Sequence, residues 1–476
     1  PISWTGGGTD GNWSTGGNWD GGATPASSTS TDIWITGDTN VGALTQDVAA
    51  PFVLNRLQVT GAGMTNAVDT GGQALSFQAD GVLRPSIHIS RNTAVTLSGA
   101  LELAADTEFI IDNGDAANDL TVSGTVTGSG EIIKYGLGTV LFNGAGGGFA
   151  GRVQVNGGTI RLASNALING NGRLHNNSGG GGTYDLNGIN ESVIALGGNL
   201  AVSNSSATPA TFTITDGGSW DYSGHISGAL SIVKQGSGVQ QFSNSCTYTG
   251  ATTIEAGTLI LSGSGSIANS SRITVDAGAT LDVTGMDNDF SVAGGQVLAG
   301  SGTVLGAAVI DTGGVLAPGA SVGNLTASGT TWNPGGTFQL EVNDALGDAG
   351  GPDGWDLLTV TDGSGTGTLD LSGLSAGNPF TIEIVSLSGT TAGEAANFVA
   401  TEPCEWEFIT YEQLAGAFSD DLFVLDTSAF ANNTGAGYFD VVQTTSGLAV
   451  AFVPEPGAFI LALTGLGVLL IRRKRR

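Results

Sequence analysis

Two stretches of this chain decide its fold, because each repeats the other: GTVTGSGEIIKYGLGTVLFNGAGGGFAGRVQVNGGTIRL (residues 124–162) and GHISGALSIVKQGSGVQQFSNSCTYTGATTIEAGTLIL (residues 224–261). Apolar and polar residues alternate within them, which indicates strands, and glycine steps between the runs indicate turns. The matching positions are Lys134 with Lys234, Phe142 with Phe242, Phe149 with Tyr248, Gly151 with Gly250 and Thr159 with Thr258. A β unit of this size cannot bury its apolar face alone, so the repetition predicts a solenoid with a shared core.

The same alternation of apolar and polar residues extends on both sides of the repeat, and the length and composition of the runs change after residue 330. Alternating runs such as SIHIS (86–90) and RITVDAGATLDV (272–283) occupy residues 35–330, which we predict to form a parallel β-helix. Longer and more aromatic runs such as TFQLEVND (337–344) follow, and they predict an antiparallel β-rich module over residues 331–452. A Trp- and Gly-rich cap over residues 1–34 and a tail over residues 453–476 complete the predicted organisation of this all-β chain.

The charge balance excludes some functions. The 476 residues include 80 Gly, 14 Lys and Arg, and 42 Asp and Glu. Five of the basic residues occupy 472–476, so the body has 14 − 5 = 9 basic residues against 42 acidic ones, a net charge of −33. Nucleic acid and anionic lipid headgroups both attract cationic surfaces, so the body is expected to bind neither. The acidic surface serves solubility through self-repulsion, or alternatively binds divalent cations such as calcium weakly.

The second copy of the repeat resembles the autotransporter-associated beta-strand repeat. The resemblance rests on KQGSG (234–238), YTG (248–250) and AGTL (256–259), and residues 124–162 are a weaker match. It implies a right-handed parallel β-helix of the kind found in passenger domains of secreted proteins. The sequence GGVLAPGASVGNLTASG (313–329) looks like the final coils of such a helix.

The last residues form a three-part tail. Pro454, Glu455 and Pro456 precede the apolar run AFILALTGLGVLLI (458–471), and Arg472, Arg473, Lys474, Arg475 and Arg476 follow it. The run has 14 residues, fewer than the roughly 20 that span a bilayer as a helix, and the basic end is expected to stay cytoplasmic. In this order the parts resemble the PEP-CTERM sorting signal. An ordinary stop-transfer anchor is the alternative.

The resemblance of the tail implies a route through the cell. It implies transient anchoring in the inner membrane through residues 458–471, recognition by an exosortase-type protease, and transfer to the surface or matrix of a Gram-negative-type bacterium. The chain begins at Pro1, without Met, so we also expect that an export signal has been removed or that the chain has been trimmed.

The N-terminal tryptophans allow two interpretations. Trp4, Trp13 and Trp19 lie among Gly, Asn, Asp, Ser and Thr in the run WTGGGTDGNWSTGGNWDGG. The end of a stacked β structure needs protection from solvent, so these rings can form a cap. Exposed rings at such spacing can instead stack on sugars and bind a polysaccharide.

Residues that could act in catalysis or bind a metal ion are few. Lys134 and Lys234 occupy equivalent repeat positions, which indicates an architectural role, and His175 in a Gly/Asn-rich loop is interpreted as a surface residue. Asp112, Asp115 and Asp119 form the best calcium-loop candidate, although their spacing is not that of an EF-hand. Pairing of Cys246 with Cys404 stays open. The chain is therefore expected to be an exported structural or adhesive surface or matrix protein that is not an enzyme; the alternatives are a polysaccharide-active lyase or hydrolase and a carbohydrate-binding surface protein.

Overall fold

The fold is all-β in this computed structural model. It describes residues 1–36, 44–60, 67–68, 73–90, 94–112, 119–144, 146–170, 172–177, 179–215 and 217–455. Besides strands, the regular elements of the described residues are three short 3-10 turns, η1 (Gly16–Asn18), η2 (Asp20–Gly22) and η3 (Asp420–Leu422). The chain divides into two compact units: unit 1 comprises Pro1–Ala251 with Ser264–Ser270, and unit 2 comprises Thr252–Gly263 with the residues from Ser271 onward.

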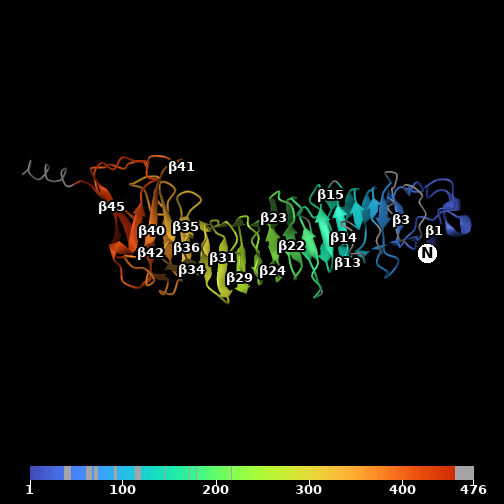
Figure 1. The fold of residues 1–476 in the computed structure, drawn as a ribbon, viewed down its shortest axis with the longest axis horizontal. Helices are drawn as coiled ribbons and strands as arrows, with labels where there is room; N and C mark the ends of the chain where they lie inside the picture. Colours follow the sequence, from blue (N-terminus) through green and yellow to red (C-terminus); the bar gives the residue numbers. More distant parts are fainter. Residues whose placement is uncertain are drawn as a thin grey trace, which may run out of the picture. The chain divides into compact units, whose positions relative to one another are not determined.

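Three parallel sheets make up most of unit 1 (Figure 1, blue to green). The first sheet contains β1 (Ile2–Trp4), β2 (Asp32–Ile35), β4 (Arg56–Val59), β7 (Ser86–Ile89), β10 (Thr107–Ile111), β13 (Ile132–Tyr135), β16 (Val153–Val155), β18 (Arg173–His175) and β21 (Ala195–Leu196). The second contains β5 (Ala67–Val68), β8 (Val95–Leu97), β11 (Leu120–Val122), β14 (Thr139–Phe142), β17 (Thr159–Leu162), β19 (Thr183–Asp185), β22 (Ala201–Asn204) and β25 (Ile226–Gly228). The third contains β3 (Phe52–Leu54), β6 (Leu75–Phe77), β9 (Leu101–Leu103), β12 (Val126–Gly128) and β15 (Gly146–Phe149).

The chain visits these sheets in turn, so each turn of the solenoid is one coil. β10, β11 and β12 form one coil and β13, β14 and β15 form the next, each strand pairing in parallel with its counterpart. Ile132 pairs with Val153 and Val153 pairs with Leu174, so both coils are 153 − 132 = 174 − 153 = 21 residues long. Thr107 pairs with Ile132, a coil of 132 − 107 = 25 residues. The stacked parallel coils are consistent with the predicted β-solenoid.

In-register stacking gives unit 1 its core. The first sheet aligns Leu57, Ile87, Phe109, Lys134 and Val155 in one inward-facing column, and every one of these side chains is 0% exposed. Apolar residues at alternate strand positions reach such columns because side chains alternate between the two faces of a strand. The lysine is the exception to the apolar pattern.

The last coils of unit 1 contain strands that lie outside the three sheets described above. β20 (Glu191–Val193), β23 (Ala210–Ile214) and β26 (Leu230–Lys234) pair in parallel, as do β24 (Ser219–Tyr222) and β27 (Val239–Phe242). In β26 Lys234 pairs with Ile214, which in turn pairs with Val193, so this lysine also occupies an inward-facing column.

Unit 2 continues the parallel pattern in two sheets (Figure 1, yellow to red). One contains β28 (Thr252–Ile254), β30 (Arg272–Val275), β33 (Val297–Gly300), β35 (Val315–Pro318), β37 (Thr337–Val342), β40 (Phe380–Ser388), β41 (Thr391–Ala392) and β44 (Phe423–Asp426). The other contains β29 (Thr258–Gly263), β31 (Thr280–Met286), β32 (Phe290–Val292), β34 (Thr303–Ile310), β36 (Asn324–Trp332), β38 (Leu357–Val360), β39 (Thr368–Asp370), β42 (Cys404–Tyr411), β43 (Gln413–Ala415), β45 (Tyr438–Gln443) and β46 (Gly447–Val453).

The predicted antiparallel module over residues 331–452 is correct only in part. β37, β40 and β44 pair in parallel, and so do β36, β38 and the end of β42. Among the strands of this range, antiparallel pairs join β40 with β41 and β46 with β42 and β45; isolated antiparallel bridges join Val342 with Trp355 and Ser375 with Asn378. Longer, aromatic strands were misread as antiparallel because pairing direction depends on connections that alternation does not encode.

An aromatic cluster lies beside the antiparallel strands of unit 2. Phe430 and Phe439 meet edge to face at 5.1 Å, and Trp406 lies 5.6 Å from Phe439. Phe398 and Phe452 complete the cluster, with 4.9 Å between their ring centroids. Trp406, Phe430 and Phe452 are buried in this cluster, and Phe398 and Phe439 are half-buried at its edge.

Candidate functional site

The N-terminal tryptophans lie in the core of unit 1. Trp4, Trp13 and Trp19 are 2%, 0% and 2% exposed. The ring centroid of Trp19 lies 4.9 Å from that of Trp4 and 5.6 Å from that of Trp13, and Trp13 meets Phe52 of β3 at 5.3 Å, all edge to face. Sugar stacking needs an open ring face. The burial therefore favours the cap interpretation over the carbohydrate-binding one.

Asp112 and Asp119, two of the three residues predicted to form a calcium loop, contact protein groups in the structure. Asp112 Oδ2 lies 2.7 Å from His88 Nε2, and buried Asp119 accepts a hydrogen bond from the backbone N–H of Thr139 at 2.7 Å. Asp115 lies outside the described residues. Across the described ranges, no three His, Cys, Asp or Glu side chains gather as a metal-holding group. Calcium binding at these residues stays a prediction.

Lys134 and Lys234 hold the turns that follow their strands. Lys134 Nζ donates hydrogen bonds to the backbone oxygens of Tyr135, Gly136 and Gly157 at 2.7, 3.0 and 3.2 Å. Lys234 Nζ donates to the two equivalent oxygens, those of Gln235 and Gly236, at 2.6 and 2.9 Å. Burial lowers the pKa of Lys134 to about 8, while the carboxylates of Asp119 and Asp112 oppose that shift. The shared contacts agree with the predicted architectural role.

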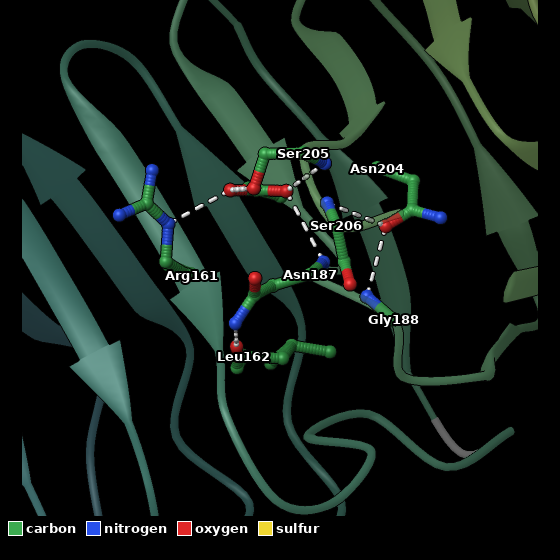
Figure 2. A network of polar contacts seen from close by, with 8 residues as sticks. Arg161, Leu162, Asn187, Gly188, Asn204, Ser205 and Ser206 are labelled. Carbon is green, nitrogen blue, oxygen red and sulfur yellow. Dashed lines mark hydrogen bonds and ion pairs between the residues drawn. The ribbon is translucent and has the colours of Figure 1, made fainter. Parts of the chain in front are cut away.

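A polar network joins neighbouring coils in the second sheet of unit 1 (Figure 2). Asp185 accepts hydrogen bonds from Arg161 Nε at 2.8 Å, from the backbone N–H of Asn187 at 3.1 Å, and from Ser205 N and Oγ at 3.0 and 2.7 Å. Asn204 Oδ1 accepts from the N–H groups of Gly188 and Ser206. Burial acts to raise the pKa of Asp185, but the bonds from Ser205 and Arg161 outweigh it and lower that pKa. The donors surround this carboxylate, which indicates a structural role.

A second buried carboxylate, Glu191, closes a loop. It accepts hydrogen bonds from the backbone N–H groups of Leu167, Ile168 and Asn169 and, at 2.7 Å, from the hydroxyl of Tyr184. Burial, with the nearby Glu191 charge, raises the pKa of Tyr184 well above its ordinary value. These contacts fix the chain between β17 and β18.

The sequence did not predict a polar pocket of about 280 Å³ on the outer surface of unit 1. Arg173 and His175 point into it from β18, on either side of the inward-facing Leu174. Arg152, Trp220 and Asp221 also line it. His175 was interpreted as a surface loop residue; it lies instead on a strand, and its side chain is 13% exposed.

A buried carboxylate, Glu131, holds two of the residues that line this pocket. Glu131 Oε1 lies 2.8 Å from His175 Nε2, and Glu131 Oε2 lies 3.5 Å from a terminal nitrogen of Arg152. The Glu131 side chain is 7% exposed, whereas that of Arg152 is 51% exposed. The ion pair and the hydrogen bond fix the orientation of the imidazole and neutralise the carboxylate.

The remaining residues considered in the sequence analysis are those of the C-terminal tail and the two cysteines. Pro454 and Glu455 follow β46, whereas Pro456, the apolar run 458–471 and the basic residues 472–476 lie outside the described residues. Within the part of the chain that is described, no helix has the length and apolar character that crossing a bilayer requires. Cys246 and Cys404 are both free thiols, and burial raises the pKa of each to about 11.

Comparison with known proteins gives two similarities. Residues 232–261, which include most of the second repeat copy, match the family model of the passenger-associated-transport-repeat. The adhesin BmaC autotransporter of Brucella suis biovar 1 (strain 1330) is 31% identical over 269 residues, which are 50% of this chain. The aligned part is 8% of that adhesin, so this chain spans a small fraction of its relative's length. The family match does not extend to residues 453–476.

Proposed function

We propose that this chain is an exported surface or matrix protein of a Gram-negative bacterium and that its solenoid body acts in adhesion. The observation on which the proposal depends is the passenger-type repeat at residues 232–261, which falls on β26 and β27 of unit 1 and on β28 and β29 of unit 2, all of them strands with parallel partners in their own unit. The similarity to an autotransporter adhesin supports the same function.

The chemistry of the body suits binding through an extended surface. Parallel stacking pairs the backbone of each coil with its neighbours, so the outer face presents side chains on a firm support. Thr, Ser and Asn are frequent at these positions and offer many hydrogen bonds of modest strength. The excess of 42 acidic over 14 basic residues limits self-association through repulsion.

Residues 453–476 act in this proposal as a PEP-CTERM sorting signal. The order of Pro454-Glu455-Pro456, the apolar run 458–471 and the basic residues Arg472–Arg476 supports it. An exosortase-type protease recognises the tail while 458–471 holds the chain at the inner membrane, and cleavage near the motif releases the body. Mass spectrometry of the surface-located protein is expected to find no peptide from 472–476; a mature protein that retains them contradicts the sorting proposal.

The adhesive function is tested in the bacterium that produces the chain. Deletion of the gene is expected to reduce attachment to polysaccharide-coated surfaces or cohesion between cells, and the wild-type gene is expected to restore both. Unchanged attachment and cohesion after deletion contradict the proposal. Adhesion requires no turnover, so the purified protein is expected to leave polysaccharides intact with and without calcium. Sustained depolymerisation would favour the alternative of a polysaccharide-active enzyme.

A further inference from the structure

The pocket that contains Arg173 differs from the rest of the body in its charge. The body has 9 basic residues, as counted above, and Arg152 and Arg173 are two of them in one pocket. Their separation, 173 − 152 = 21 residues, equals the coil spacing that pairs Val153 with Leu174. Consecutive coils therefore place the two guanidinium groups on the same outer face, although the body is strongly acidic.

Arg173 is held in place and its donors remain available. Its guanidinium carbon lies 4.3 Å from the centroid of the Trp220 ring, a cation–π contact. Arg152 is engaged by Glu131, but within the described residues Arg173 makes no ion pair with a carboxylate. A guanidinium group presents a planar set of N–H donors that matches a carboxylate. This side chain is therefore oriented to receive an anion.

The hollow exists because one outward position has no side chain. Gly197 follows β21, next to His175 of β18 in the same sheet. A Cβ atom there would lie 3.7 Å from Trp220 Cε3 and from the Asp221 backbone oxygen and 3.9 Å from His175 Cβ, which is ordinary van der Waals contact, so the position admits a side chain among residues that line the pocket. Gly197 therefore offers a way to fill the pocket by mutation.

We propose that this pocket binds a uronic acid unit of an acidic polysaccharide. Arg173 pairs with the sugar carboxylate, and the Asp221 carboxylate and the Asn177 amide accept and donate hydrogen bonds to its hydroxyls. Trp220 borders the sugar ring and keeps the guanidinium in position. Charges beyond the Debye length of about 8 Å at physiological ionic strength are largely screened, so the charges that decide binding are those at the pocket, where Arg152 and Arg173 offset the carboxylates of Glu131 and Asp221. The inference gives the proposed adhesive function a ligand class and therefore rests on it.

The test measures binding of the purified full chain to two oligosaccharides of equal length and linkage, an oligogalacturonate and the corresponding neutral oligogalactoside. Wild-type protein is expected to bind the uronate at least about tenfold more tightly. Arg173→Gln and Gly197→Leu are each expected to weaken uronate binding by about tenfold or more. Arg56→Gln, an exposed arginine on β4 of the same sheet, is the matched control and is expected to leave binding within about twofold.

Circular dichroism and thermal unfolding establish that each variant is folded before binding is compared. Equal affinity for the two oligosaccharides, or uronate binding that neither pocket variant weakens, overturns the inference. Cells with Arg173→Gln that attach to a polygalacturonate coat as well as wild-type cells also overturn it, while the adhesive function stands. If deletion of the whole gene leaves attachment unchanged, the proposed function fails, and oligosaccharide binding alone decides whether the pocket is a saccharide site.

Discussion

A lysine inside an aliphatic column shows how a single residue can shape a coil. Lys134 stands in register between Phe109 and Val155, yet its ammonium group donates hydrogen bonds to three backbone oxygens. These oxygens lie where the chain leaves one sheet and enters the next. The lysine supplies a donor to these oxygens from the interior of the coil and so ties the turn to the core.

Lys134→Met tests this role. The substitution keeps the apolar stem and removes the donor, so three backbone oxygens lose the hydrogen bond from the ammonium group. We expect the free energy of unfolding to fall by about 3 kcal/mol, measured by urea denaturation of unit 1 followed by tryptophan fluorescence. Tyr135→Phe, a change at an exposed neighbour, is the control and is expected to alter it by less than about 0.5 kcal/mol. Equal stability of the two variants would show that the bonds are dispensable.

The titration of Lys134 gives a pH-dependent test. Its folded pKa is about 8 and the ordinary pKa of a lysine is 10.5, so between these values the unfolded chain binds more protons than the folded one. Stability from this group therefore rises as pH increases from about 8 to 10.5. Relative to Lys134→Met, the wild-type protein is expected to gain at most about 3 kcal/mol across this window. A constant difference between the two proteins across the window contradicts the lowered pKa.

Asp185 gives a test at acidic pH, where its contribution to stability is expected to be lost. Its folded pKa lies below the ordinary aspartate value of 3.8, so its contribution to stability is fully present above that value and is lost as pH falls through the folded pKa. Asp185→Asn is expected to lower the free energy of unfolding by about 2 kcal/mol at pH 7, because donors from Ser205 and Asn187 then meet an amide. This deficit is expected to shrink below pH 4. Asp20→Asn, at an exposed carboxylate, serves as the control and is expected to show neither effect.

At the scale of the element, close approach between coils explains the glycines that the two repeat copies share. A Cβ atom at Gly151 would overlap the carbonyl oxygen of Gly130, and one at Gly250 would overlap that of Leu230. Both glycines stand at corners where one coil rests directly on the previous one. The repeat is therefore preserved at these positions by backbone contact.

Gly151→Ala and Gly250→Ala test the contact. Each is expected to destabilise unit 1 by about 3 kcal/mol, because the preceding coil must shift to admit the methyl group. Gly217→Ala is the matched control, since its Cβ atom would meet only Ser237 Oγ at 3.7 Å. Differential scanning calorimetry provides the comparison. Similar unfolding temperatures for all three variants would show that the coils can move apart to admit the methyl group without loss of stability.

The sequence was informative about elements because their signals are local. Alternation and glycine steps predicted the strands and the stacked coils, and the equivalent repeat positions of Lys134 and Lys234 predicted an architectural role for both. Pairing direction after residue 331 was predicted wrongly in part, since the parallel pairs of β37 with β40 and β40 with β44 depend on connections far apart in sequence. The pocket was missed for a similar reason. Arg152, Arg173 and Trp220 become neighbours only once the 21-residue coil spacing is known.

At the scale of the whole molecule, charge sets the response to solvent. With 42 acidic and 14 basic residues, repulsion between carboxylates opposes the compact state and is screened by salt. The unfolding temperature is expected to rise when NaCl increases from about 0.02 to about 0.5 M. Comparing calcium chloride with sodium chloride at equal ionic strength separates screening from binding. A higher unfolding temperature in calcium than in sodium would support weak binding of divalent cations by the acidic surface. An unfolding temperature that rises with neither salt would contradict the repulsion argument.

The uniform pairing of successive coils has an evolutionary consequence. Ile132 pairs with Val153, and Val153 pairs with Leu174, always one coil apart. Excision of residues 153–173 would bring Leu174 opposite Ile132, so that an aliphatic residue again faces the interior at that place. Duplication of the same segment would add a coil by the same logic. The number of coils can therefore drift between related genes through recombination within the repeat, while the rule that pairs one coil with the next is inherited unchanged.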